Sequence, residues 1–432
     1  MNKRILQLAI PSIISNITVP LLGLIDVAIV GHLGSPAYIG AVAVGGMLFN
    51  ILYWSFAFLR MGTSGMTSQA YGKRHLDEAV RLLIRSLSTG FVIGLLFVFL
   101  QIPLQMLAFH LIDASLQVEA FALVYFRICI WGAPAMLALY GFMGWFIGMQ
   151  NSRFPMYISI AQNVVNILCS LFLVFVLHLD VEGVAFGTLI AQYSGLLMAV
   201  LLWMKYYSRL GLMNHFKASL QIVEMRRFFS VNSDIFLRTL CMVVVTVFFT
   251  SSGAQQGDVI LAVNALLMQL FTLFSYIMDG FAYAGEALTG RYVGATDRRS
   301  LHRLVRLLFL WGGILSLLFT FLYAVGGSAF LGLLTNDADV INASEAYFYW
   351  VLAIPLAGFA AFLWDGIFIG ATATRYMLLS MLVASASFFV IYYSFHQQWG
   401  NHALWAAFIA YLSLRGLMQT CWSRRALRTH SI

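Results

Sequence analysis

Apolar residues along this chain gather into long stretches that are separated by short polar connections. A helix needs about 20 apolar residues to cross the hydrocarbon core of a bilayer, whereas the strands of a membrane barrel alternate over about ten residues. The stretches have the helical length, so the pattern predicts an all-α integral membrane protein with twelve transmembrane helices. These spans are expected at residues 8–31, 38–60, 80–103, 119–147, 154–178, 183–205, 229–252, 258–284, 302–326, 343–369, 375–396 and 401–423.

The composition agrees with this prediction, because 61% of the 432 residues are hydrophobic and only 10% are charged. A soluble domain would carry about 25% charged residues, so a water-soluble globule is excluded. The four cysteines stand in separate apolar stretches without metal-ligand spacing, and they are expected to be buried as small hydrophobic residues. No nucleotide-binding, metalloprotease or nucleophile-elbow motif occurs, so neither a cofactor nor a metal nor a catalytic residue is expected.

Positive charges collect on one side of the predicted topology. The connections after even-numbered spans and the two ends of the chain hold every Lys and Arg except Arg60, Arg127, Arg238 and Arg415. The connections after odd-numbered spans carry acids instead, at Asp113, Glu119, Asp180, Glu182, Asp258, Asp337, Asp339 and Glu345. Because Lys and Arg concentrate in cytoplasmic loops, both termini are expected in the cytoplasm, in a bacterial-type inner membrane. The net charge of +8 then requires no nucleic acid partner.

The two halves of the chain resemble each other at an offset of 222 residues. This shift superposes Gly72 on Gly294, and it superposes Phe146-Ile147-Gly148 on Phe368-Ile369-Gly370. Six spans per half is an even number, so the halves share one orientation and form a parallel repeat. We therefore expect an N-lobe at 1–205, a cytoplasmic linker at 206–228 and a C-lobe at 229–432, with a central cleft for alternating access.

Charged residues inside the predicted spans are functional candidates, because a charge is costly in the membrane. Asp26 is the only acid expected within the membrane part of the N-lobe, roughly 27 Å along a helix that rises about 1.5 Å per residue. Neutral polar residues of spans 5 and 6 reach similar depths, namely Asn163, Asn166, Ser170 and Thr188. Burial favours the protonated form of a carboxyl, so Asp26 is a candidate proton carrier. The neutral residues are either its partners or hydrogen-bonding contacts between helices.

Two further features of the spans suggest mechanism. Pro11 and Pro20 interrupt the hydrogen-bond ladder of span 1, which permits a bend there. The C-lobe spans carry five charged residues, namely Asp279, Glu286, Asp365, Arg238 and Arg415. These five residues form either a neutralised structural network or a site for a cation or coupling ion, and the sequence leaves both readings open.

Several segments resemble the multidrug and toxic compound extrusion (MATE) family, in its DinF-like branch. They are LAIPSIISNITVPLLGLIDVAIVGHLG, GMTSQAYGK, VNALLMQLFTLFSYIMDGFAYAGEALTGRYVGA and LWDGIFIGATATR. The resemblance covers essentially the whole chain, and it implies two six-helix lobes that export drugs or metabolites against inward H⁺ or Na⁺ flow.

The resemblance also assigns roles to individual residues. Asp26 matches the family's proton-linked aspartate and Pro11 matches the proline about which its first helix bends, while Asn166 and Thr188 match polar partners. Ser170 departs from the pattern, because many relatives have a second aspartate there. In related branches acids of the C-lobe bind the coupling cation, and Glu286 and Asp365 are the nearest candidates.

The functional hypothesis is a monomeric secondary antiporter in the lipid bilayer that exports hydrophobic, amphipathic organic cations in exchange for H⁺. Sodium is the less favoured coupling ion, because the N-lobe site offers few oxygen ligands. The alternative is a lipid-linked precursor flippase of the same superfamily, which would favour a cationic cavity and additional spans. A membrane enzyme would need a nucleophile or a metal cluster, and the sequence offers neither.

Overall fold

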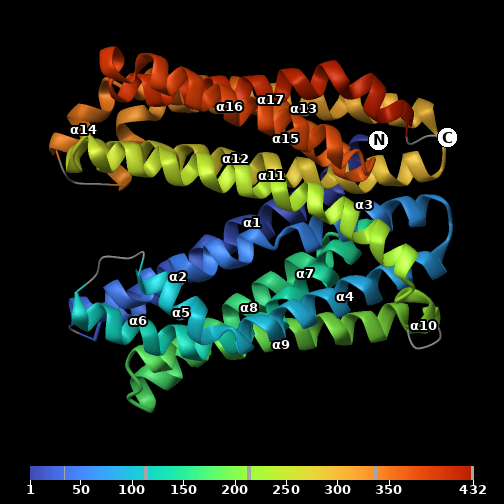
Figure 1. Ribbon diagram of the computed structural model, residues 1–432, viewed down its shortest axis with the longest axis horizontal. Coiled ribbons are helices and arrows are strands. Elements are labelled where there is room, and N and C mark those ends of the chain that lie inside the picture. The colour runs from blue at the N-terminus through green and yellow to red at the C-terminus, as the bar shows by residue number, and fades with distance from the viewer. Residues whose placement is uncertain (34, 111–114, 212–215, 335–337, 430–432) are drawn as a thin grey trace. The chain divides into compact units, whose positions relative to one another are not determined.

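The computed structural model describes residues 1–33, 35–110, 115–211, 216–334 and 338–429, and these residues contain helices and no strand. The first half contains α1 (Asn2–Gly31), α2 (Pro36–Ser55), α3 (Phe58–Gly72), α4 (Leu76–Phe99), α5 (Gln101–His110), α6 (Leu116–Cys129), α7 (Ala133–Gly148), α8 (Arg153–Leu171), α9 (Val181–Tyr207) and α10 (Phe216–Ser219). The second half contains α11 (Ile222–Gln255), α12 (Asp258–Gly294), α13 (Arg298–Leu334), α14 (Ala338–Glu345), α15 (Phe348–Gly370), α16 (Thr374–Trp399) and α17 (Asn401–Thr429) (Figure 1).

Eleven helical stretches of the described chain are long and apolar enough to cross a membrane, and they coincide with the first eleven predicted spans. The twelfth predicted span coincides with α17, which is not among them. Polar residues explain this difference, because Asn401, Arg415 and Gln419 lower the apolarity of α17 and are buried against other side chains.

Three predicted spans contain a break that the hydrophobic pattern did not indicate. The second divides between α2 and α3, the fourth contains a 3₁₀ turn at Ile130–Gly132, and the tenth divides between α14 and α15. A short π-helix, Phe172–Val176, follows α8. Apolar residues flank the breaks in the second and fourth spans, so hydropathy alone runs through them. The break in the tenth span lies near its start, after Ser344 and Glu345.

The described chain packs into two compact units, which are here named by the half of the chain that supplies most of each. The first-half unit is Ile14–Asn232, in which α3, α4 and α7 pack together and α8 packs on α9. The second-half unit is Met1–Ile13 with Ser233–Ile432, in which α15 packs against α12, α13 and α17 (Figure 1). Helices α1 and α11 each contribute to both units. The lobe boundaries at 205 and 229 stay a prediction.

Backbone geometry repeats between the two halves at the predicted offset of 222 residues. Helices α2 and α12 begin at Pro36 and Asp258, and α4 and α13 begin at Leu76 and Arg298. Residues with positive φ recur in pairs at the same offset, namely Arg74 and Thr296, Gln150 and Thr372, and His178 and Gly400. The internal repeat read from the sequence is therefore present in the folded backbone.

Paired glycines show the same repeat at the closest helix crossings. A Cβ on Gly144 of α7 would overlap the backbone carbonyl of Arg60 on α3. A Cβ on Gly366 of α15 would likewise overlap the carbonyl of Ala282 on α12. Only glycine allows the two backbones to approach this closely, and the same contact occurs in each unit.

The turn between α12 and α13 lies outside the predicted spans and is fixed by a helix cap. The backbone N–H of Ser300 donates to Asp297 Oδ1 at 3.0 Å. Hydrogen bonds from the Ser300 side chain and backbone lower the pKa of the Asp297 carboxyl, because they stabilise its charged form. The acid therefore stays ionised at the positive end of the helix dipole of α13.

Candidate functional site

Asp26 lies on α1 with 3% of its surface exposed. The hydroxyl of Thr188 on α9 donates to Asp26 Oδ2 at 3.4 Å, and Asn166 Nδ2 on α8 donates to that hydroxyl at 3.1 Å. The second carboxyl oxygen, Oδ1, is buried and has no hydrogen-bond partner among the described residues. A chain of neutral donors thus connects three helices and ends on a single buried carboxyl.

Asn163 has a different contact from the one expected of a partner of Asp26. Its Nδ2 donates to the backbone oxygen of Thr18 at 2.8 Å, and one turn earlier on α8 the hydroxyl of Ser159 meets that of Ser15 at 2.7 Å. These bonds join α8 to α1 along their shared seam. Asn163 therefore holds the helix that carries Asp26, while Asn166 reaches the carboxyl through Thr188.

Ser170 is fully buried beside α9. A Cβ on Gly187 would overlap the Ser170 hydroxyl, so the backbone of α9 lies directly against this side chain. A larger side chain at position 170 would have to displace α9. This close packing gives a physical reason for a small side chain at position 170.

Tyr125 and Cys129 also belong to the surroundings of Asp26, although the sequence reasoning missed them. Both are buried on α6, one helical turn apart, and both interact electrostatically with the Asp26 carboxyl. Tyr125 also interacts with Thr188, and the Cys129 thiol donates to the carbonyl of Ala185 at 3.6 Å. In a hydropathy pattern Tyr125 and Cys129 cannot be distinguished from ordinary apolar residues. Their spacing of four residues indicates only that they lie on the same face of a helix.

Asp365 on α15 is another buried acid, and here the structure brings positive charge to it. Arg238 of α11 donates to Asp365 Oδ2, and Arg415 of α17 lies 3.3 Å from the same oxygen. Gln419, one turn beyond Arg415, donates to Asp365 Oδ1 at 2.7 Å. The Arg415 guanidinium also lies over the ring of Phe362, 5.5 Å from its centroid. Both oxygens of this carboxyl are therefore engaged.

The remaining two charged residues predicted in the C-lobe lie on α12. Asp279 interacts electrostatically with Arg415, which brings it to the same cluster. Glu286 is buried two turns further along α12, where its backbone carbonyl packs against Gly370. Four of the five predicted residues, including Asp365 itself, thus form one cluster. Gln419 joins them without any charge that would have marked it in the sequence.

Helix α1 continues through both prolines. Each proline lacks the N–H that would continue the helical ladder, so α1 has two weakened turns before Asp26. Ser12, next to Pro11, donates its hydroxyl to the carbonyl of Leu8 at 2.9 Å. A bend at either proline stays a prediction.

Within the described residues, no group of three or more His, Cys, Asp or Glu side chains is arranged to hold a metal ion.

Comparison with known proteins gives consistent similarities in family, sequence and fold. Residues 11–172 and 235–394 match the MatE family. The chain is 39% identical over 425 residues to DNA damage-inducible protein F of Escherichia coli K12, across 98% of this chain and 92% of that protein. The fold is similar to a crystal structure of a MATE protein in the bent conformation, with a TM-score of 0.88 and 19% identity over 99% of this chain and 96% of that one. It is also similar to VcmN of Vibrio cholerae in its bent form, with a TM-score of 0.87 and 17% identity over 99% and 97%.

Proposed function

Since this chain belongs to the MATE family of multidrug and toxic compound efflux transporters, we propose that it is an H⁺-coupled antiporter with Asp26 as its protonation switch. Its substrates are amphipathic organic cations. The chain crosses the cytoplasmic membrane many times with both termini inside, where most of its Lys and Arg residues then lie.

The contrast between Asp26 and Asp365 supports this proposal. Asp365 has two guanidinium groups beside it, whereas no salt bridge joins Asp26 among the described residues. A buried carboxylate without a cation is costly, and it becomes neutral either by binding a proton or by meeting a cationic substrate. Exchange of a proton for a cation requires at least one carboxyl that binds either of them but not both at once.

The proposed cycle follows from this competition. Ionised Asp26 attracts a cationic substrate while Thr188 donates to Oδ2. A proton from the outside neutralises the carboxyl and weakens the attraction, so the substrate leaves. Release of that proton to the cytoplasm restores the charge. Sodium is less favoured than H⁺, because the polar groups around Asp26 supply only one carboxylate.

The flippase alternative is not favoured. A lipid-linked pyrophosphate would need positive charge to bind it, whereas the buried charged residue of the N-lobe site is an acid. In the C-lobe cluster, the two arginines already face Asp365 and Asp279.

The test is transport of a fluorescent organic cation in proteoliposomes, with a pH gradient or a Na⁺ gradient imposed alone. Asp26→Asn keeps the size and hydrogen bonding of the side chain but cannot titrate, so export driven by the pH gradient should fall to the level of empty liposomes. Asp180→Asn is a matched control, because Asp180 is an exposed acid that accepts a hydrogen bond from Tyr38 at 3.0 Å. Export by Asp26→Asn at the wild-type rate under a pH gradient alone would contradict the proposal.

A further inference from the structure

Helix α13 of the second-half unit presents a stripe of exposed apolar side chains in its middle part (Figure 1). Leu310, Ile314, Leu317 and Phe321 are each between 50% and 63% exposed. They recur at spacings of three and four residues, so they lie on one face of the helix. Because α13 is a candidate membrane span, this apolar face meets the hydrocarbon core of the bilayer.

The same face becomes basic toward the start of α13. Arg299, Arg303 and Arg306 continue the spacing of the apolar residues, and all three are exposed. Arg306 precedes Leu310 by one turn, which is about 6 Å along the helix. The long arginine side chain reaches from the edge of the hydrocarbon core to the headgroups. These three arginines, here called the basic stripe, therefore leave the helix on its lipid-facing side at the depth of the lipid phosphates.

Protein acids neutralise little of this charge. Among the described residues, no ion pair joins Arg303 or Arg306 to an acid. Asp297 interacts with Arg299, but its carboxylate also accepts the bond from Ser300 that caps the helix. Like charges three or four residues apart destabilise a helix. An anion bound across the guanidinium groups would remove this repulsion.

The internal repeat shows that the fold does not require this charge. At the offset of 222 residues, α4 carries Asp77 where α13 carries Arg299, and Arg81 where α13 carries Arg303. The first turn of α4 contains two acids, and one of them, Glu78, lies 4.0 Å from Arg81. The first turn of α13 contains no acid. One half of the repeat thus balances its charge with its own side chains, whereas the other leaves its arginines available.

We propose that the basic stripe binds the headgroup of an anionic phospholipid in the leaflet that meets the start of α13, which is the inner leaflet in the predicted orientation. Guanidinium groups donate strong hydrogen bonds to phosphate oxygens, and basic residues at this depth are attracted to anionic lipids. A zwitterionic lipid carries its own ammonium group beside the phosphate. The three positive charges therefore favour a headgroup with net negative charge, whose acyl chains lie along Leu310 and Ile314.

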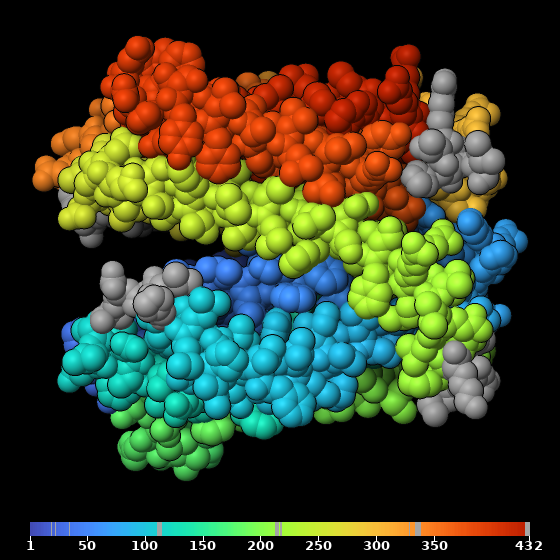
Figure 2. Space-filling view, in the orientation of Figure 1, coloured from blue at the N-terminus to red at the C-terminus, as the bar shows by residue number. Residues whose placement is uncertain are grey.

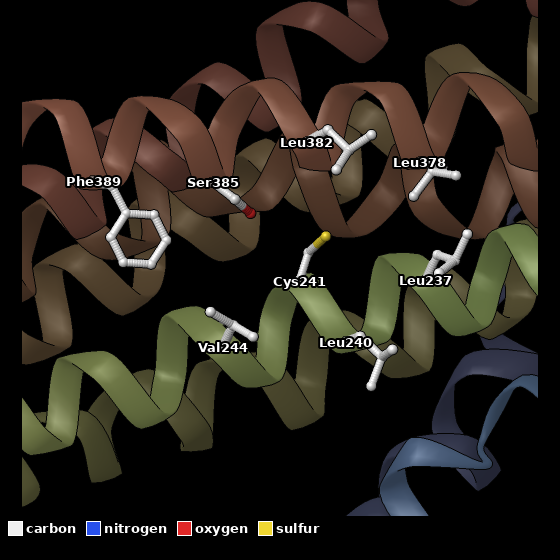
Figure 3. Close-up of a pocket in the computed structure, with 8 residues that line it drawn as sticks. All are labelled: Leu237, Leu240, Cys241, Val244, Leu378, Leu382, Ser385 and Phe389. Atoms are coloured by element: carbon white, nitrogen blue, oxygen red, sulfur yellow. The ribbon is translucent and has the colours of Figure 1, made fainter.

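The headgroup, rather than the acyl chains, makes this site selective. Helices α11 and α16 also reach the surface, where Figure 2 draws them in yellow-green and orange-red. The groove between them is lined by apolar side chains such as Leu240, Val244 and Leu382, and its described lining contains no charged residue (Figure 3). Acyl chains of any phospholipid fit such a surface. Selection for a negative headgroup is therefore expected at α13 and not at this groove.

The experiment is photolabelling of the intact protein in phosphatidylcholine nanodiscs that contain increasing fractions of a phosphatidylglycerol with a diazirine near its headgroup. Mass spectrometry of the adducts locates the label. We expect saturable labelling of α13 around Leu310, for which unlabelled phosphatidylglycerol competes and phosphatidylcholine does not. Combining Arg299→Gln, Arg303→Gln and Arg306→Gln should raise the half-saturating fraction by at least about tenfold, because each arginine contributes to the attraction.

The repeat supplies a matched control. Arg303→Gln alone should raise the half-saturating fraction by about fivefold. Arg81→Gln removes the equivalent residue of the first-half unit and should leave that fraction unchanged, because Arg81 already lies beside Glu78. Both substitutions keep a side chain that is compatible with a helix and leave the buried face of each helix intact.

Three results would overturn the proposal. Labelling spread equally over the lipid-facing helices would mean that acyl chains alone place the lipid. Competition by soluble glycerol 3-phosphate would mean that the stripe binds a free anion instead of a lipid. Equal effects of Arg303→Gln and Arg81→Gln would mean that surface charge in general attracts the lipid. The measurement involves no transport, so its failure would leave the role proposed for Asp26 intact.

Discussion

At the scale of single residues, two buried aspartates have opposite surroundings. Within the described part of the chain Asp26 meets only neutral groups, whereas Asp365 lies between Arg238 and Arg415. A charge inside the membrane costs free energy whether or not it is paired. A carboxyl paired with a cation stays ionised, whereas a carboxyl without one can gain or lose a proton. The difference separates an acid suited to binding protons from one suited to holding helices together.

The Asp365 cluster makes an asymmetric prediction for stability. Asp365→Asn leaves two guanidinium groups facing each other, so it should cost about 3–5 kcal/mol of unfolding free energy. Arg238→Met should cost less, because Arg415 still neutralises Asp365. The double variant should recover part of the loss. Denaturant or thermal unfolding in detergent measures all three. A larger loss for Arg238→Met than for Asp365→Asn would show that the cluster is not held by this charge balance.

At the level of residues, the sequence marked candidates where a charge stood out against an apolar background. Asp26, Arg238 and Arg415 were visible in this way. The two arginines contact Asp365, and Asp279 interacts with Arg415. Tyr125 and Gln419 were not visible, because a neutral side chain shows its importance only through the neighbours that the fold supplies. Asn163 donates a hydrogen bond to Thr18 instead of contacting Asp26 as expected. This choice of partner depends on the register of α8 against α1, which hydropathy does not specify.

At the scale of helices, close crossings at glycine hold each unit. Gly144 meets the carbonyl of Arg60 and Gly366 meets that of Ala282, which are equivalent positions in the repeat. The superposition of these glycines was predictable, but the crossings were not, because a sequence offset does not say which backbones touch.

These crossings predict the effect of a single added methyl group. Gly144→Ala and Gly366→Ala should each lower the unfolding free energy by about 1–3 kcal/mol, because the methyl group overlaps a backbone oxygen that cannot move aside. Gly23→Ala and Gly313→Ala are matched controls, since a Cβ there meets nothing within 4 Å. Alanine favours the helix by roughly 0.5–1 kcal/mol, so the controls should be neutral or slightly stabilising. Equal effects in both groups would contradict the close approach.

At the scale of the whole chain, two sequence features predict most of the organisation. The positions of Lys and Arg predict the orientation in the membrane, and the internal repeat predicts two similar halves. The 222-residue offset was readable from the sequence and recurs in the backbone at Arg74 and Thr296. The breaks within three spans and the assignment of Met1–Ile13 to the second-half unit were not readable, because both depend on packing rather than on local hydropathy. Asp113 and Asp337, which helped to define the outer loops, lie outside the described residues.

The orientation is testable with single cysteines on a background without native ones. Gln117→Cys and Asp339→Cys lie at exposed positions of the predicted outer side, so an impermeant maleimide should label them in intact cells. His75→Cys and Asp297→Cys lie at exposed positions of the predicted inner side, so they should react only after permeabilisation. The reverse pattern would invert the topology and the direction of export.

The polar residues of α17 have a consequence for how this protein enters the membrane. Arg415 lies near the middle of α17, where a charged residue costs about 2.5–3.5 kcal/mol when a helix leaves the translocon alone. Asn401 and Gln419 add to that cost, and their partners are Asn264 on α12 and Asp365 on α15. These partners precede α17 in the chain and are synthesised before it. Because α17 is predicted to span the bilayer, we expect its insertion to be a cooperative step. Helices already embedded in the membrane supply the hydrogen-bonding and charged partners that the lipid cannot.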